Sequence, residues 1–280
     1  MNEPLQVIPW EWHWHPDPGV IEGLVALTVL YVLAMGAGKA YLAPQAPAFS
    51  RWRQAAFHLG TLLVFLSVAT PLDELSEVYL FSAHMFQHVI LVFPVPVLWL
   101  WGTPGWLLEP FLKMDWSAPL FRLFTRPLVA FSIFVVVFYA WHIPGLYEWA
   151  LRDSKVHFLE HATFMGAALL QWWPLMPPLQ VGKPLHPAWQ LLYLLANSIV
   201  QFPLFFLLAF TNRTFYPTYV NAPRITQLTP AMDQQLGAIL MKVASMGVMF
   251  IAMVVIFGRW YYREGDRRRP STISAGLARP

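Results

Sequence analysis

Seven long blocks of apolar residues dominate the sequence and limit what the chain can fold into. Most are close to the roughly 20 residues that an α-helix needs to cross about 30 Å of hydrocarbon. They carry few charges and lack the alternation of β-strands, which excludes a membrane β-barrel. Helices buried in a soluble protein would show polar stripes, which these blocks also lack. The blocks cover residues 20–42, 55–69, 79–101, 127–143, 156–176, 189–210 and 236–257.

The sequence therefore predicts an all-α, polytopic membrane helix bundle with about seven transmembrane helices. The composition agrees, because 57% of the 280 residues are hydrophobic, against roughly 45–50% in ordinary globular chains. We expect residues 1–262 to form a single transmembrane domain. Residues 263–280 are polar and basic, and we expect them to form a disordered cytoplasmic tail.

The distribution of lysine and arginine predicts the orientation in the membrane, because basic loops remain in the cytoplasm. Alternate loops and the tail are basic, with Lys39, Arg51, Arg53, Lys113, Arg122, Arg126, Lys183, Arg259 and Arg263. The N-terminal segment before Lys39 contains acids but no Lys or Arg. We therefore expect a multi-pass protein of the cytoplasmic membrane, with the N-terminus outside and the C-terminus in the cytoplasm. The positive charge reflects this topology, and a nucleic-acid partner is not expected.

Five histidines fall at one predicted depth, in the outer third of the membrane: His84, His88, His142, His157 and His161. Two pairs have a spacing of four residues, which places both side chains on one helix face, about 5–6 Å apart at the β-carbons. A single histidine in a membrane helix can simply bond a neighbouring helix. Five at one depth favour metal binding, because polar groups are costly in hydrocarbon.

Other polar residues allow a functional and a structural interpretation. His58 lies near the predicted inner end of its span and does not join the five. His13 and His15 could guide a metal inward, or they could belong to an interfacial aromatic anchor. Lys242 lies inside the last span and needs a carboxylate, a backbone carbonyl or a route to water.

The residue types around the five histidines favour copper weakly. The chain has no cysteine, which excludes a thiolate carrier, and imidazole suits copper, zinc, iron and nickel. Met85 and Met241 could add thioether ligands, which favour Cu(I), although methionine is also an ordinary core residue. Asp73, Glu160 and Asp233 could orient imidazoles from a second shell, or they could be interfacial acids.

Six short motifs occur in the order found in a known family. They lie at residues 70–73 (TPLD), 84–88 (HMFQH), 141–147 (WHIPGLY), 156–161 (VHFLEH), 172–174 (WWP) and 233–237 (DQQLG). In these motifs the chain resembles the seven-span CtaG proteins, which are associated with assembly of caa3-type cytochrome c oxidase. The N-terminal 50 residues and the basic tail contribute little to this resemblance.

The resemblance implies a non-enzymatic assembly factor that handles copper for the oxidase, with the CuB centre as the expected destination. It carries the metal-binding role to the five histidines, with Asp73 and Glu160 as weaker members. The implied partners are oxidase subunits, above all subunit I, the lipid bilayer, and a soluble copper donor on the outer side. Four alternatives stay open at this point: a haem-binding b-type electron carrier, a metal enzyme of the outer face, a copper transporter, which would need further ligands toward the inner side, and an assembly scaffold without metal.

Overall fold

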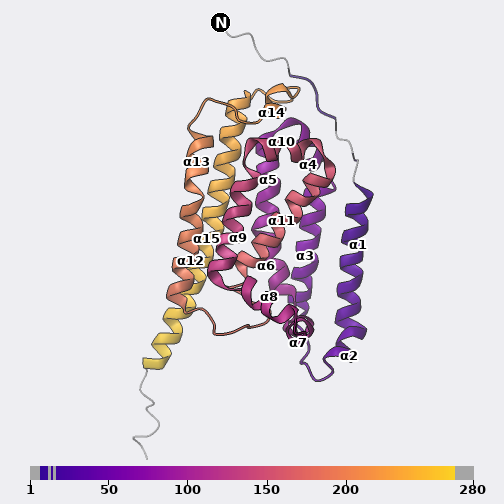
Figure 1. Cartoon of the computed structure of the whole chain (residues 1–280), viewed down its shortest axis with the longest axis vertical. Coiled ribbons are helices and arrows are strands. Elements are labelled where there is room, and N and C mark those ends of the chain that lie inside the picture. Colours follow the sequence, from indigo (N-terminus) through magenta and orange to yellow (C-terminus); the bar gives the residue numbers. More distant parts are fainter. Residues whose placement is uncertain (1–6, 12–13, 15–16, 269–280) are drawn as a thin grey trace, which may run out of the picture.

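The computed structural model of the chain describes residues 7–11, 14 and 17–268, and no strand occurs among them. Seven long helical runs lie side by side along one direction (Figure 1). Each of the seven apolar blocks lies mainly within one of them. The runs are α1 Pro18–Leu33 continued by a π-helical turn Ala34–Gly38 and α2 Lys39–Leu42; α3 Arg51–Val68; α5 Phe81–Val92 with α6 Pro94–Gly102; α9 Pro127–Trp141; α11 Ser154–Trp172; α12 Pro187–Val200 with α13 Phe202–Ala209; and α15 Pro230–Arg268.

Short helices cover the two ends of this bundle. At one end, the α10 end, lie α4 Pro71–Glu74, the π-helical turn Leu75–Tyr79, α10 Pro144–Arg152 and α14 Pro217–Asn221. At the other end, the α8 end, lie a 3-10 turn Gly105–Leu107, α7 Glu109–Lys113 and α8 Ser117–Phe124.

Four helices in the described part of the chain are long and apolar enough to cross a membrane, or up to six if each of two bent pairs counts as one span. Helix α11 is in neither group, although it is a 19-residue helix. Its own polar residues explain this, because His157, Glu160 and His161 lower its hydropathy. The chain is thus an all-helical protein with several membrane-scale helices, and the prediction of seven spans goes beyond this count.

Charge differs between the two ends of the bundle. The α8 end carries the basic side chains of loops and short helices, which are Arg51, Arg53, Lys113, Arg122, Arg126 and Lys183. The α10 end carries six acids of loops and short helices, Asp17, Asp73, Glu74, Glu77, Glu148 and Asp153, with fewer basic residues, Arg152, Lys155, Arg213 and Arg224. This asymmetry is the one from which the orientation was predicted.

The site depends on how α5 is held in the centre of the bundle. Helix α5 packs against α15, α11 and α3, and Pro94 ends it because proline cannot donate the next helical hydrogen bond. Gly237 allows the close approach of α15. A β-carbon at this position would lie 2.5 Å from Cδ1 of Phe81 and 3.2 Å from Cγ of Met85.

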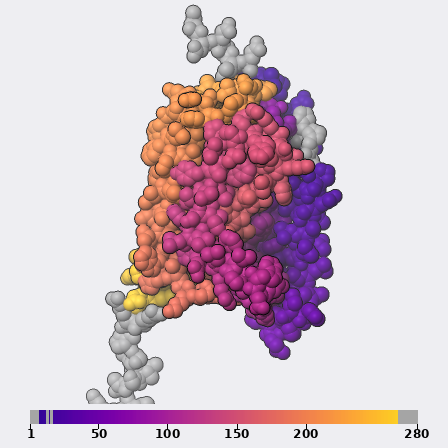
Figure 2. All heavy atoms as spheres, viewed as in Figure 1, coloured from indigo at the N-terminus to yellow at the C-terminus, as the bar shows by residue number. Residues whose placement is uncertain are grey.

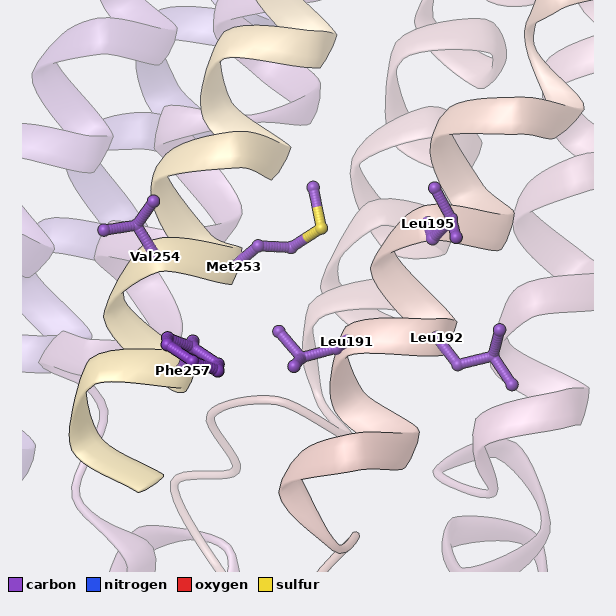
Figure 3. A pocket seen from close by; sticks show the side chains of 6 residues that line it. All are labelled: Leu191, Leu192, Leu195, Met253, Val254 and Phe257. Atoms are coloured by element: carbon purple, nitrogen blue, oxygen red, sulfur yellow. The ribbon is translucent and has the colours of Figure 1, made fainter. Parts of the chain in front are cut away.

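Much of the outer surface of the long helices is apolar. The first long helix, Pro18–Leu42, forms one flank of the molecule (Figure 2). Only 6% of the residues in its 18-residue apolar stretch are buried. Figure 3 shows a shallow groove between α12 and α15, lined by Leu191, Leu192, Leu195, Met253, Val254 and Phe257. Such side chains suit contact with hydrocarbon and offer no group for chemistry.

Lys242 has a partner within the bundle. Its Nζ donates a hydrogen bond of 2.7 Å to the carbonyl of Ser198 and lies 3.7 Å from the centroid of the Phe202 ring. Both lie next to the break between α12 and α13, which Pro203 produces. The cation is therefore met by a backbone carbonyl and an aromatic face.

The predicted boundary of the tail needs a correction. Helix α15 continues past residue 262 to Arg268, so residues 263–268 are helical rather than disordered. Arginine and glutamate are good helix formers and extend the helix beyond its apolar part. Residues 269–280 lie outside the described part of the chain.

Candidate metal centre

Helices α5 and α11 bring four of the five predicted histidines together. His84 and His88 on α5 have ring centroids 4.5 Å apart, and His157 and His161 on α11 have centroids 4.3 Å apart. Across the two helices, His88 and His161 are 5.1 Å apart, and His84 and His157 are 5.9 Å apart. All four side chains are buried. The spacing of four in each helix thus produces one compact group, called here the four-histidine centre.

Glu160 supplies a carboxylate to this centre. Its Oε1 lies 3.7 Å from Nε2 of His84 and 3.5 Å from Nε2 of His88, and its side chain is 2% exposed. One candidate ligand atom each from His84, His157 and Glu160 lies within 4.8 Å of the others. A buried carboxylate needs a nearby positive charge or hydrogen-bond donors, so this group is suited to a cation.

Several polar atoms of the centre lack a hydrogen-bond partner among the described residues. They are Nδ1 of His84 and His88, Nε2 of His157 and His161, and Oε2 of Glu160. Leaving such an atom unpaired costs about 1–3 kcal/mol. A metal ion would accept lone pairs from imidazoles and carboxylate, so the residues present fit a bound metal.

Glu77 supports the centre from the π-helical turn Leu75–Tyr79. Its carboxylate contacts Nδ1 of His157. A proton on Nδ1 that is donated to Glu77 leaves the lone pair on Nε2 free for a metal, which is a common second-shell arrangement. Nothing in the spacing of Glu77 from the histidines in the sequence indicates this contact.

Asp233 and Asp73 act on α5 rather than on an imidazole. Asp233 is buried and accepts hydrogen bonds from the backbone N–H groups of Phe81 and Ser82, at 2.7 and 3.2 Å, and from the Ser82 hydroxyl. It thereby caps the first turn of α5 from α15. Asp73 accepts a bond of 2.7 Å from Nε2 of Gln87.

Aromatic side chains close the centre toward the α10 end. The Tyr147 ring lies 5.0 Å from the His84 ring, and the hydroxyl groups of Tyr147 and Tyr219 are 3.1 Å apart. Tyr219 also donates to the carbonyl of Ser76 at 2.6 Å. Burial raises the pKa of Tyr219 well above its ordinary value, so its hydroxyl keeps the proton that it donates.

The fifth predicted histidine, His142, lies outside this group. It caps the end of α9, where its Nδ1 donates to the carbonyl of Phe138 at 2.6 Å. The Phe164 ring packs against both His142 and His88, with centroid distances of 6.2 and 4.9 Å. Of the two predicted methionines, Met85 packs toward Gly237, whereas Met241 faces the same internal cavity as His142.

The remaining histidines are far from the centre or outside the described residues. His58 contacts the edge of Tyr31 between α3 and α1, at 5.3 Å. His186 caps α12, where its Nδ1 accepts from the N–H of Ala188. His13 and His15 lie among the residues that the structure does not describe, so their proposed guiding role stays a prediction.

Comparison with known families agrees with this architecture. A family described as the cytochrome c oxidase caa3 assembly factor (Caa3_CtaG) matches residues 29–263. The chain belongs to this family. The match contains the four-histidine centre with Glu77, Glu160 and Asp233. Neither the curated proteins nor the solved structures compared with the chain gave a match.

Membership of the Caa3_CtaG family confirms the resemblance seen in the motifs. It makes the chain a member of a family of assembly factors for cytochrome c oxidase. The family description names no metal and no site residue.

Proposed function

We propose that this Caa3_CtaG protein binds a copper ion as its cargo in the four-histidine centre and passes it to the CuB centre of the caa3 oxidase. The observation that carries the proposal is the convergence of four buried imidazoles and one buried carboxylate from two helices. A bound ion would also engage ring nitrogens and a carboxylate oxygen that have no hydrogen-bond partner among the described residues.

The dimensions of the centre support an ion rather than a haem. A haem needs axial ligands on opposite sides of a macrocycle. The four rings here are 4.3–6.4 Å from one another where they pack, which leaves no room for a macrocycle. Imidazole and carboxylate would also suit zinc, and the oxidase named in the family description favours copper.

The proposed topology has seven spans, including α11, with the N-terminus outside the cytoplasm and the C-terminus inside, in the cytoplasmic membrane. The basic α8 end then faces the cytoplasm, and the four-histidine centre lies near the outer face. Oxidase subunit I is the proposed recipient, and a soluble donor on the outer side is the proposed source. The protein acts as a carrier and not as an enzyme.

Metal analysis together with optical spectroscopy tests this proposal. The detergent-solubilised full chain is compared with a variant in which His84, His88, His157 and His161 are replaced by alanine. A second variant, His186→Ala, removes a histidine outside the centre and serves as the matched control. We expect at least about one copper ion per chain in the wild type and in the control. The quadruple variant should lose this copper.

Two other results would contradict the proposal. Haem absorption bands in the purified protein would favour the electron-carrier alternative. The absence of both copper and haem, even after incubation with Cu(I), would leave an assembly scaffold with structural histidines.

A further inference from the structure

A small internal cavity lies beside the four-histidine centre and is lined by residues from α5, α9, α11 and α15. Its volume is about 20 Å³, enough for one water-sized occupant. Three side chains on its wall can ligate a metal, and these are His88, His142 and Met241. The wall also includes the side chain of Gln201 and several Phe and Val residues, and no acid among the described residues.

Both imidazoles on this wall have an unpartnered nitrogen. His142 has its Nδ1 engaged with the Phe138 carbonyl, and its Nε2 is buried without a partner among the described residues. A proton on Nδ1 leaves the lone pair on Nε2. His88 has its Nε2 engaged with His84 and Glu160, and its Nδ1 is likewise without a described partner. Both side chains are more than nine-tenths buried.

Met241 adds a soft ligand atom to the same cavity. It is buried on α15, and a thioether carries no charge and no proton. Soft thioether ligands favour Cu(I) over hard divalent ions. A divalent ion would lack a carboxylate on this wall to offset its charge, so the donor set is matched to a monovalent ion.

We propose that His88, His142 and Met241 form a second copper position, specific for Cu(I), separate from the four-histidine centre. This inference rests on the proposed copper-carrier function. His88 belongs to both positions, with one ring nitrogen for each. When both positions are filled, the ring gives up its remaining N–H proton to bulk water and bridges the two ions as an imidazolate. Copper therefore has two adjacent sites in the bundle, one of nitrogen and oxygen ligands and one that includes sulfur.

Copper K-edge X-ray absorption on the full chain tests this assignment, because sulfur and nitrogen neighbours of copper are distinguishable. The protein is loaded anaerobically with excess Cu(I), and the unbound ion is removed. We expect two copper ions per chain and a sulfur neighbour in part of the signal. Met241→Leu should remove the sulfur signal. Met249→Leu, at another buried methionine of α15, should leave it unchanged.

A second variant keeps the test informative if Met241→Leu folds poorly. His142→Gln should reduce copper from two ions to one per chain, with the helical content by circular dichroism unchanged. One copper ion without sulfur in the wild type, lost in the quadruple histidine variant, would overturn the second position but preserve the carrier function. Sulfur that persists in Met241→Leu would also overturn it. No bound copper at all would overturn both proposals.

Discussion

Replacing Asp233 by alanine should destabilise the protein more than an ordinary loss of a helix cap. The carboxylate is 1% exposed and accepts two backbone hydrogen bonds and one hydroxyl bond at the first turn of α5. Loss of a cap costs about 1 kcal/mol, and each buried donor left unsatisfied costs about 1–3 kcal/mol. We therefore expect a loss of about 3 kcal/mol, or about a hundredfold in the unfolding equilibrium.

Asp153 provides the matched control for this experiment. It caps α11, the other helix of the four-histidine centre, through the backbone N–H groups of Lys155 and Val156, at 2.9 and 3.4 Å. This cap is exposed and local, so water can replace it, and Asp153→Ala should cost about 1 kcal/mol or less.

Reversible unfolding in mixed micelles, followed by circular dichroism, measures both free energies of unfolding. Asp233→Ala should also weaken copper binding, because α5 carries His84 and His88. Equal losses for the two variants would refute the reasoning, since the argument depends on burial of the Asp233 bonds. Wild-type stability of Asp233→Ala would refute it more strongly.

Three further predictions concern packing, metal affinity and topology. Gly237→Val should lower the free energy of unfolding by about 1–3 kcal/mol, because the added carbons meet Phe81. Gly247→Ala, at a position with open space around it, should be neutral or stabilising. Both variants are measured by thermal unfolding, and equal effects would contradict this reasoning. Glu77→Gln should raise the copper dissociation constant about 10- to 100-fold, as measured by competition with a Cu(I) chelator. An unchanged constant would show that the contact between Glu77 and His157 does not support the site. Because the chain has no cysteine, an impermeant maleimide should label Asn212→Cys but not Asp115→Cys in intact cells, and the reverse pattern would invert the predicted orientation.

The helical blocks and the two histidine pairs could be predicted from the sequence, because both depend on local periodicity. Apolar length specifies a membrane helix, and a spacing of four specifies one face. Which faces meet depends on packing between helices. The sequence therefore placed His142 with the other four, whereas the cap of α9 directs it toward a different cavity.

Contacts made by residues outside the long helices could not be predicted in the same way. Glu77 reaches His157 from a π-helical turn, and the position of such a turn depends on the surrounding packing. Asp233 contacts backbone groups of α5 across more than 150 positions of sequence. An aspartate at the start of a helix usually suggests a local cap, so its action on another helix had no sequence signal.

The single buried carboxylate of the four-histidine centre has an electrostatic consequence. Neutral imidazoles contribute no charge, so Glu160 with one monovalent ion gives a centre with no net charge. A divalent ion would leave one positive charge on these five side chains, and it would have to be offset from outside them, by a carboxylate such as the partly exposed Glu77 on His157. The protein loaded with Cu(I) can therefore present an electrically neutral interior to a neighbouring membrane protein. Transfer of the ion between two such interiors would then not require an isolated charge to cross the lipid.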